Sequence, residues 1–228
     1  MDGPGSSDLA PGLVLGSDVE IGGDVAFGAD VVVHSGTVIG EGVSIGDRAV
    51  LGKPARLAPG SAAAGDGGEP LRVGVRARVG AGTVLLAGAA LGPGVEVGER
   101  AFVRERARLG RDAVVGPGAC IDNDVVVGGG VTIGRDAYVT AFSSVADDAE
   151  VGAGVCTTND DTMARHERGS RLRGAVLGRG CRVGDRAVLT PGVEIGADAV
   201  IAPDAIVTRD VPEGARAAGA PARAEEDG

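Results

Sequence analysis

The sequence predicts an all-β fold, a parallel β-helix built from hexapeptide repeats. Three observations lead to this prediction: an aliphatic residue recurs at every sixth position, a glycine follows most of these residues, and large aromatic side chains are scarce. The chain has 228 residues, with 42 Gly, three Phe, one Tyr and no Trp. An α-helix repeats every 3.6 residues and an isolated strand every two, so neither produces a six-residue apolar period. Such a period is typical of a β-helix whose interior holds small aliphatic side chains.

The repeat runs in three blocks, over residues 15–51, 73–157 and 177–207, and 26 of its 28 apolar positions are Ile, Leu or Val. We expect three hexads to complete one coil of a triangular prism. Glycine follows the apolar position in 18 hexads, where we expect it to allow a tight turn. Eight of the ten exceptions fall on one edge of the prism, which we call the polar edge: His34, Leu86, Arg104, Asp122, Thr140, Thr158, Thr190 and Thr208. This edge either has a slightly different turn conformation or lines a groove or a subunit interface.

Two segments interrupt the repeat and are expected to form excursion loops. Residues 53–72 are rich in Ala, Gly and Pro, whereas residues 159–176 are densely polar, as expected of a loop that carries chemistry. To keep the polar edge in phase, each segment must insert somewhat less than one full coil of extra chain. The expected organisation is a flexible N-terminus over 1–12, a β-helix domain of about ten coils over 13–223 and an acidic tail over 224–228.

Charge and cysteine content narrow the possible functions. The formal net charge is −10, with 32 acidic and 22 basic residues, so a nucleic-acid partner is not expected. The chain has no apolar run of about 18 residues and its first residues resemble no secretory signal, so no membrane partner is expected. Cys120, Cys156 and Cys181 are odd in number and widely spaced, which indicates reduced thiols in a cytoplasmic protein rather than a metal site.

Two longer segments resemble those of a known superfamily. Residues 207–223, VTRDVPEGARAAGAPAR, are similar to the closing segment of sugar and small-molecule acetyltransferases with a left-handed β-helix, and residues 145–160, VADDAEVGAGVCTTND, resemble nucleotide-sugar N-acetyltransferases. The resemblance covers residues 13–223 and implies a left-handed β-helix acyltransferase. It also implies an acetyl-CoA dependent N- or O-acetyltransferase that acts on an amino or hydroxyl group of a sugar or nucleotide-sugar. The resemblance further implies a homotrimer that holds coenzyme A between neighbouring prisms.

The chain departs from the family pattern at two places. Gly134 and Arg135 stand where nucleotide-sugar members usually carry Gln-Asn or Lys-Asn, so the family's acceptor contact there is not carried over. Related acetyltransferases place a catalytic histidine close to the position of Asp160. This chain has no histidine there, and His166 follows six residues later.

Acyl transfer from a thioester needs a proton acceptor, an oxyanion donor and well-positioned substrates. A backbone N–H can serve as the oxyanion donor. The resemblance at residues 158–160 favours Asp160 or His166 as the catalytic base and Asn159 as the group that positions the acceptor. His34 lies about six coils, or roughly 29 Å, from Thr158 and is expected to be structural.

Further candidates stack on successive coils of the polar edge, about 5 Å apart, or are arginines. The expected substrate contacts are Asp122, Asn123, Thr140 and Thr158. Alternatively, these side chains only satisfy the backbone of their own turns. The arginines that could contact the phosphates of coenzyme A or of a nucleotide are Arg104, Arg165, Arg209 and Arg223.

Two other functions use a fold of this kind. A zinc enzyme of the carbonic anhydrase type needs three histidine ligands, and this chain has only two histidines, so no metal is expected. A non-catalytic scaffold or interaction protein stays open as the alternative, although the polar segment 159–176 favours an enzyme.

Overall fold

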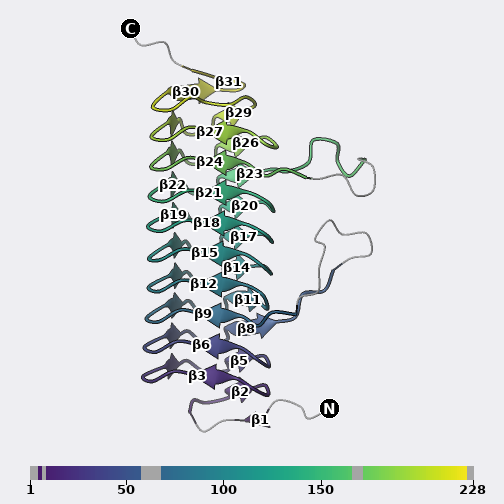
Figure 1. The fold of residues 1–228 in the computed structure, drawn as a ribbon, viewed down its shortest axis with the longest axis vertical. Helices are drawn as coiled ribbons and strands as arrows, with labels where there is room; N and C mark the ends of the chain where they lie inside the picture. The colour runs from purple at the N-terminus through teal and green to yellow at the C-terminus, as the bar shows by residue number, and fades with distance from the viewer. Residues whose placement is uncertain (1–4, 7–8, 58–67, 166–171, 225–228) are drawn as a thin grey trace.

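The computed structural model describes residues 5–6, 9–57, 68–165 and 172–224. Within these ranges the secondary structure is entirely β. Short strands, parallel except for one antiparallel pair at each end, form three sheets that run the length of a straight rod (Figure 1). The predicted β-helix of about ten coils with two excursions is confirmed. In the described part of the chain, no helix is long and apolar enough to cross a membrane.

Each coil contributes one strand to each sheet. Sheet A contains β1 (Gly5–Ser6), β2 (Val14–Leu15), β5 (Val32–Val33), β8 (Val50–Lys53), β11 (Val84–Leu86), β14 (Phe102–Val103), β17 (Cys120–Ile121), β20 (Tyr138–Val139), β23 (Cys156–Thr157), β26 (Val188–Leu189) and β29 (Ile206–Val207). Sheet B contains β3 (Glu20–Ile21), β6 (Val38–Ile39), β9 (Arg72–Val73), β12 (Ala90–Leu91), β15 (Arg108–Leu109), β18 (Val126–Val127), β21 (Ser144–Val145), β24 (Val176–Leu177) and β27 (Glu194–Ile195). Sheet C contains β4 (Ala26–Phe27), β7 (Ser44–Ile45), β10 (Arg78–Val79), β13 (Glu96–Val97), β16 (Val114–Val115), β19 (Thr132–Ile133), β22 (Glu150–Val151), β25 (Arg182–Val183), β28 (Val200–Ile201), β30 (Arg216–Gly219) and β31 (Ala222–Ala224).

The strand register follows the expected coil of three hexads. Val103 pairs with Ile121, its equivalent one coil later. At the two excursions the register jumps, because Leu51 pairs with Leu85 and Thr157 pairs with Leu189. In both cases the partner lies almost one extra coil further along the chain. This excess is the insertion that keeps the polar edge in phase, as the repeat predicted.

The core is a column of small aliphatic side chains along the axis of the rod. Inward positions such as Leu85, Ile121 and Ala107 are 0% exposed. A parallel strand pair buries its inward side chains directly above one another, so each coil completes the packing of its neighbour. The narrow interior therefore accounts for the near absence of aromatic residues.

The glycines that follow the aliphatic residue of a hexad are required for a different reason from the one expected. At Gly134 a Cβ atom would lie 2.5 Å from the backbone nitrogen of Ala153 and from the carbonyl carbon of Gly152 on the next coil. The positive φ of that corner belongs instead to Asp136, two residues later, at 54°. A tight turn does begin at Gly134, since the N–H of Ala137 donates to its carbonyl oxygen at 3.3 Å, but the positive φ of that turn falls on Asp136 and not on the glycine. Close approach of successive coils is what excludes a side chain at Gly134.

The polar edge is a real edge of the prism. All eight of its residues directly follow, or in the case of Leu86 end, a strand of sheet A. Both excursions leave from this same corner, since the chain passes from β8 to β9 and from β23 to β24, each time from sheet A to sheet B. Figure 1 accordingly shows the described stems of both loops leaving the same side of the rod. Five coils separate β8 from β23, so the loops emerge about 24 Å apart.

Candidate functional site

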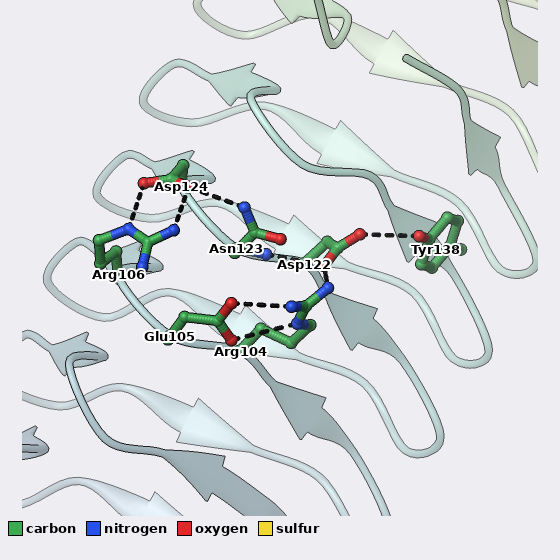
Figure 2. A network of polar contacts seen from close by, with 7 residues as sticks. All are labelled: Arg104, Glu105, Arg106, Asp122, Asn123, Asp124 and Tyr138. Atoms are coloured by element: carbon green, nitrogen blue, oxygen red, sulfur yellow. Dashed lines mark hydrogen bonds and ion pairs between the residues drawn. The ribbon is translucent and has the colours of Figure 1, made fainter. Parts of the chain in front are cut away.

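A network of charged side chains lies on the polar edge between the two loops (Figure 2). Arg104, after β14, donates from Nη1 to Oδ1 of Asp122 at 2.6 Å and from Nη2 to Oε1 of Glu105 at 2.7 Å. Oδ2 of Asp122 accepts a hydrogen bond of 2.8 Å from the hydroxyl of Tyr138 in β20. Glu105 is 0% exposed and Asp122 7%, so a single arginine compensates two buried carboxylates.

A second ion pair flanks this chain of contacts on the neighbouring turn positions. Arg106 donates from Nε and Nη2 to both oxygens of Asp124, at 2.7 and 2.8 Å. Nδ2 of the buried Asn123 donates to Oδ2 of Asp124 at 2.7 Å. Burial alone would raise the pKa of the Asp124 carboxyl, but the hydrogen bonds from Arg106 and Asn123 outweigh it and lower that pKa.

Two groups on the outer face of sheet A are affected by the same network. Burial, followed by the hydrogen bond to Asp122, raises the pKa of Tyr138 to about 12. Burial, followed by the negative charge of Asp122, raises the pKa of the Cys120 thiol to about 11. Both side chains are therefore neutral at physiological pH. Because the Tyr138 hydroxyl donates its hydrogen bond to Asp122, it can act towards a ligand only as a hydrogen-bond acceptor, through its lone pairs.

The upper part of the polar edge mainly satisfies backbone groups. Oγ1 of Thr157 accepts a hydrogen bond from the backbone N–H of Thr140 at 2.8 Å. The hydroxyl of Thr158 donates to the carbonyl of Leu189 at 3.2 Å, and Nδ2 of Asn159 donates to the carbonyl of Ala141 at 3.3 Å. These contacts match the alternative in which turn side chains bond to nearby backbone. They also fix these residues firmly at the base of the second loop.

Asp160 organises the first turn of the second loop. Its Oδ1 accepts hydrogen bonds from the backbone N–H and the hydroxyl of Thr162, at 2.8 and 2.6 Å. Its Oδ2 accepts from the backbone N–H of Ala164 at 2.6 Å. The carboxylate thus has a structural task, besides its predicted role as a base. His166, the other predicted base, lies outside the described residues.

The structure does not bring the four candidate arginines together. Arg104 belongs to the charged network, whereas Arg209 follows β29, five coils or about 24 Å away along the rod. Arg165 is exposed on the second loop, and Arg223 is exposed in β31 at the end of the helix. One phosphate group can therefore contact Arg104 or Arg209 within a subunit, and not both.

His34 lies on the polar edge near the first loop. Its carbonyl oxygen accepts a hydrogen bond of 2.7 Å from the hydroxyl of Thr37. Burial, followed by the nearby charge of Lys53, lowers the pKa of the imidazole. His34 is thus neutral at physiological pH, and its coil lies far from the second loop.

A pocket of about 470 Å³ adjoins Arg104 under the stem of the first loop. It is lined by Lys53, Pro54, Ala55, Arg56, Leu57, Leu86, Phe102, Arg104 and Glu105. The sequence pattern singled out only Arg104 and Leu86 of these residues, and it also missed Tyr138. The available signals were that Lys53 is the sole lysine and Tyr138 the sole tyrosine of the chain.

Comparison with known proteins adds a family match. Residues 174–209, which form coils next to the second loop, match the model of the bacterial transferase hexapeptide, six repeats. This chain is a left-handed hexapeptide-repeat β-helix. No curated protein gives a significant match to this hexapeptide-repeat protein.

Several solved structures are similar to this hexapeptide-repeat protein. The acetyltransferase domain of PglB from Neisseria gonorrhoeae is 17% identical, with a TM-score of 0.40, over 63% of this chain and 57% of its own. PerB from Caulobacter crescentus, in complex with CoA and GDP-perosamine, is 24% identical, with a TM-score of 0.32, over 63% and 57%. UDP-N-acetylglucosamine O-acyltransferase (LpxA) from Moraxella catarrhalis is 18% identical, with a TM-score of 0.38, over 96% and 70%. The chain thus spans 57% of the length of the PglB domain and of PerB, and at these scores activity must be argued from its own residues.

Proposed function

We propose that the chain is an acetyl-CoA dependent acyltransferase that acetylates an amino or hydroxyl group of a sugar or nucleotide-sugar. The observation that carries this proposal is the row of buried polar side chains on one edge of a rod whose other two edges carry mainly glycine at the equivalent positions. Glu105, Asn123 and Asp122 are 0%, 3% and 7% exposed. Buried charges are costly to keep, so their concentration beside a pocket favours a functional site. The match to a transferase repeat supports the same function.

We assign separate roles in the reaction to the residues on the polar edge and at the start of the second loop. The acceptor would contact the lower edge at Asp122 and Asn123, and Thr140 and Thr158 would lie on the following coils. Asp160 or His166 would take the proton that leaves the attacking amine or hydroxyl, while Asn159 positions the acceptor. The bond from the acetyl carbon to the acceptor forms as the bond to sulfur breaks, and coenzyme A leaves as its thiol.

We place the active protein in a homotrimer that packs through the outer face of sheet A from β17 to β29. The outward residues of these strands carry no charge: Cys120, Tyr138, Cys156, Val188 and Ile206. Charged residues occupy outward positions on the other two sheets, such as Arg108 on sheet B and Glu150 on sheet C. An uncharged face next to the polar edge is suited to subunit contact and would leave coenzyme A and the acceptor at its border. Native mass spectrometry would give three times the chain mass.

The reduced thiols support a cytoplasmic location for this reaction, since the three cysteines are free in the structure. The activity test is to incubate the protein with acetyl-CoA and a panel of free and nucleotide-linked amino sugars. Thiol release and the acetylated product are measured together. The proposal requires both signals for at least one acceptor, and a loss of about 10²–10⁴-fold in rate for whichever of Asp160→Asn and His166→Ala removes the base.

Asp204→Asn is the matched control, because Asp204 is an exposed partner of Arg186 far from the polar edge corner. If neither variant slows transfer, the proposed base is wrong. If no acceptor gives thiol release and acetyl-CoA does not stabilise the protein against unfolding, the protein is better described as a non-catalytic scaffold.

A further inference from the structure

The pocket under the first loop has a shape set by the way β8 leaves the coil. β8 continues past the corner to Lys53, whose carbonyl accepts a hydrogen bond of 3.0 Å from the N–H of Ala87. This extra pairing shifts the register next to Leu86 and holds the loop stem beside the outer face of sheet A. A volume of about 470 Å³ between stem and sheet lies within the range of small-molecule sites, about 300–1,000 Å³.

Cationic side chains line this pocket: Lys53, Arg56 and Arg104. Glu105 is the only carboxylate that lines it, and both its oxygens accept hydrogen bonds from Arg104, at 3.2 and 2.7 Å. Lys53 and Arg56 are exposed, and among the described residues no carboxylate forms an ion pair with either. Within the part of the chain that the structure describes, two cations without an ion-pair partner thus line this pocket, on a chain of net charge −10. They would attract an anionic group.

Apolar side chains line the same pocket. Phe102, half-buried in β14, faces outward from sheet A, and Leu57 and Leu86 also line the pocket. Leu57 is 37% exposed, which is apolar surface that a ligand could cover. A ligand that suits both kinds of side chain carries an anionic group and a flat or apolar group.

We propose that this pocket binds a nucleotide, with its phosphates at Lys53 and Arg56 and its base against Phe102. Arg104 also lines the pocket, and its hydrogen bonds to Glu105 and Asp122 hold its guanidinium in place. The inference rests on the proposed function only for the source of the nucleotide. That source is either the nucleoside diphosphate of a nucleotide-linked acceptor or the adenosine bisphosphate portion of coenzyme A.

Calorimetric titration of the full chain tests this site without any need for turnover. The probes are uridine diphosphate, adenosine 3′,5′-bisphosphate, uridine and inorganic phosphate. We expect one of the two nucleotides to bind at least tenfold more tightly than uridine or phosphate, with an affinity that weakens as salt rises. Which nucleotide binds identifies the source.

Variants assign the binding to the pocket. The double variant Lys53→Gln with Arg56→Gln should weaken nucleotide affinity more than tenfold, and Phe102→Ala should weaken the nucleotide and leave phosphate unchanged. Arg78→Gln, a change of an exposed arginine on sheet C, is the matched control and should bind as the wild type does. Equal thermal melting temperatures of the variants establish that they fold.

The proposal is overturned if neither nucleotide binds, or if the double variant binds nucleotide with unchanged affinity. These results are separable from failure of the proposed function. Nucleotide binding without acetyl transfer refutes the enzyme and keeps the pocket, whereas transfer with unchanged nucleotide affinity in the variants refutes the pocket alone.

Discussion

Tyr138 and Asp122 share a hydrogen bond of 2.8 Å between the phenolic hydroxyl and Oδ2, although they come from different coils. The bond joins the apolar outer face of sheet A to the charged polar edge. Asp122 is nearly buried, whereas Tyr138 is 38% exposed. The pair therefore presents a polar atom, held from behind by a buried carboxylate, on a surface that otherwise lacks one.

Titration of Tyr138 should reveal this relationship directly. Tyr138 is the only tyrosine and the chain has no tryptophan, so the ultraviolet signal of tyrosinate reports on one residue. We expect a single transition near pH 12, because burial and the bond to Asp122 both oppose ionisation. Asp122→Asn should lower this midpoint towards, without reaching, the ordinary value of about 10. A midpoint at the ordinary value in the wild type would contradict the contact.

The same shift predicts how stability depends on alkaline pH. The folded protein holds the Tyr138 proton more tightly than the unfolded chain, so the stabilisation is fully present below about pH 10. It is lost as the pH rises from there to about 12. Urea unfolding at several pH values should show this extra loss in the wild type, and Tyr138→Phe should remove it. An identical alkaline slope in both proteins would contradict the prediction.

Arg104 should contribute far more to stability than an exposed arginine. Arg104→Met leaves Glu105 buried without its partner, and breaking a buried pair in this way costs about 3–5 kcal/mol. Chemical denaturation measures this loss in the free energy of unfolding. Arg186→Met is the matched control, because the side chains of Arg186 and Asp204 are 67% and 62% exposed, and it should leave stability nearly unchanged.

The origin of this loss can be isolated with a second change. Adding Glu105→Gln to Arg104→Met removes one of the two buried charges that lost their partner, since Asp122 keeps its own, and should recover part of the lost stability. A double variant less stable than Arg104→Met would show that Glu105 acts through another contact.

We expect the hexad corners to require glycine because it has no side chain. Gly134→Ala places a Cβ atom against the backbone of the next coil and should cost about 1–3 kcal/mol of stability. Gly23→Ala is the control, since a Cβ there would meet only Cγ of Glu41, at 3.9 Å, and thermal unfolding should change little. Equal melting temperatures for both variants would contradict the close approach of the coils as the reason for glycine at this position.

Asp160 offers a test that separates structure from catalysis. Asp160→Asn keeps an acceptor oxygen for the N–H groups of its turn, whereas Asp160→Ala removes both. A residue that acts as a base loses activity in both variants alike, by about 10²–10⁴-fold. If Asp160 only orders the loop, Asp160→Asn should lose much less activity than Asp160→Ala. Steady-state rates of the two variants decide between these roles.

The sequence by itself determined the coil, the strand register and the polar edge. Inward side chains of a β-helix must stack in every coil, so positions such as Ile121 repeat with a period that is visible in the chain. The same constraint showed where residues interrupt the coil, and how much chain they insert. It also placed Asp122, Thr140 and Thr158 in one row.

Only the tertiary structure decided which side chains meet outside that core. Outward residues such as Tyr138 are under no periodic packing constraint, and Arg56 lies in a loop whose path the repeat does not specify. Tyr138 reaches Asp122, and the loop stem reaches Phe102, because stacked coils bring residues distant in sequence within a few ångströms. The pattern of the core thus predicts the scaffold, while the contacts on its surface depend on side-chain length, charge and burial, which only the folded chain combines.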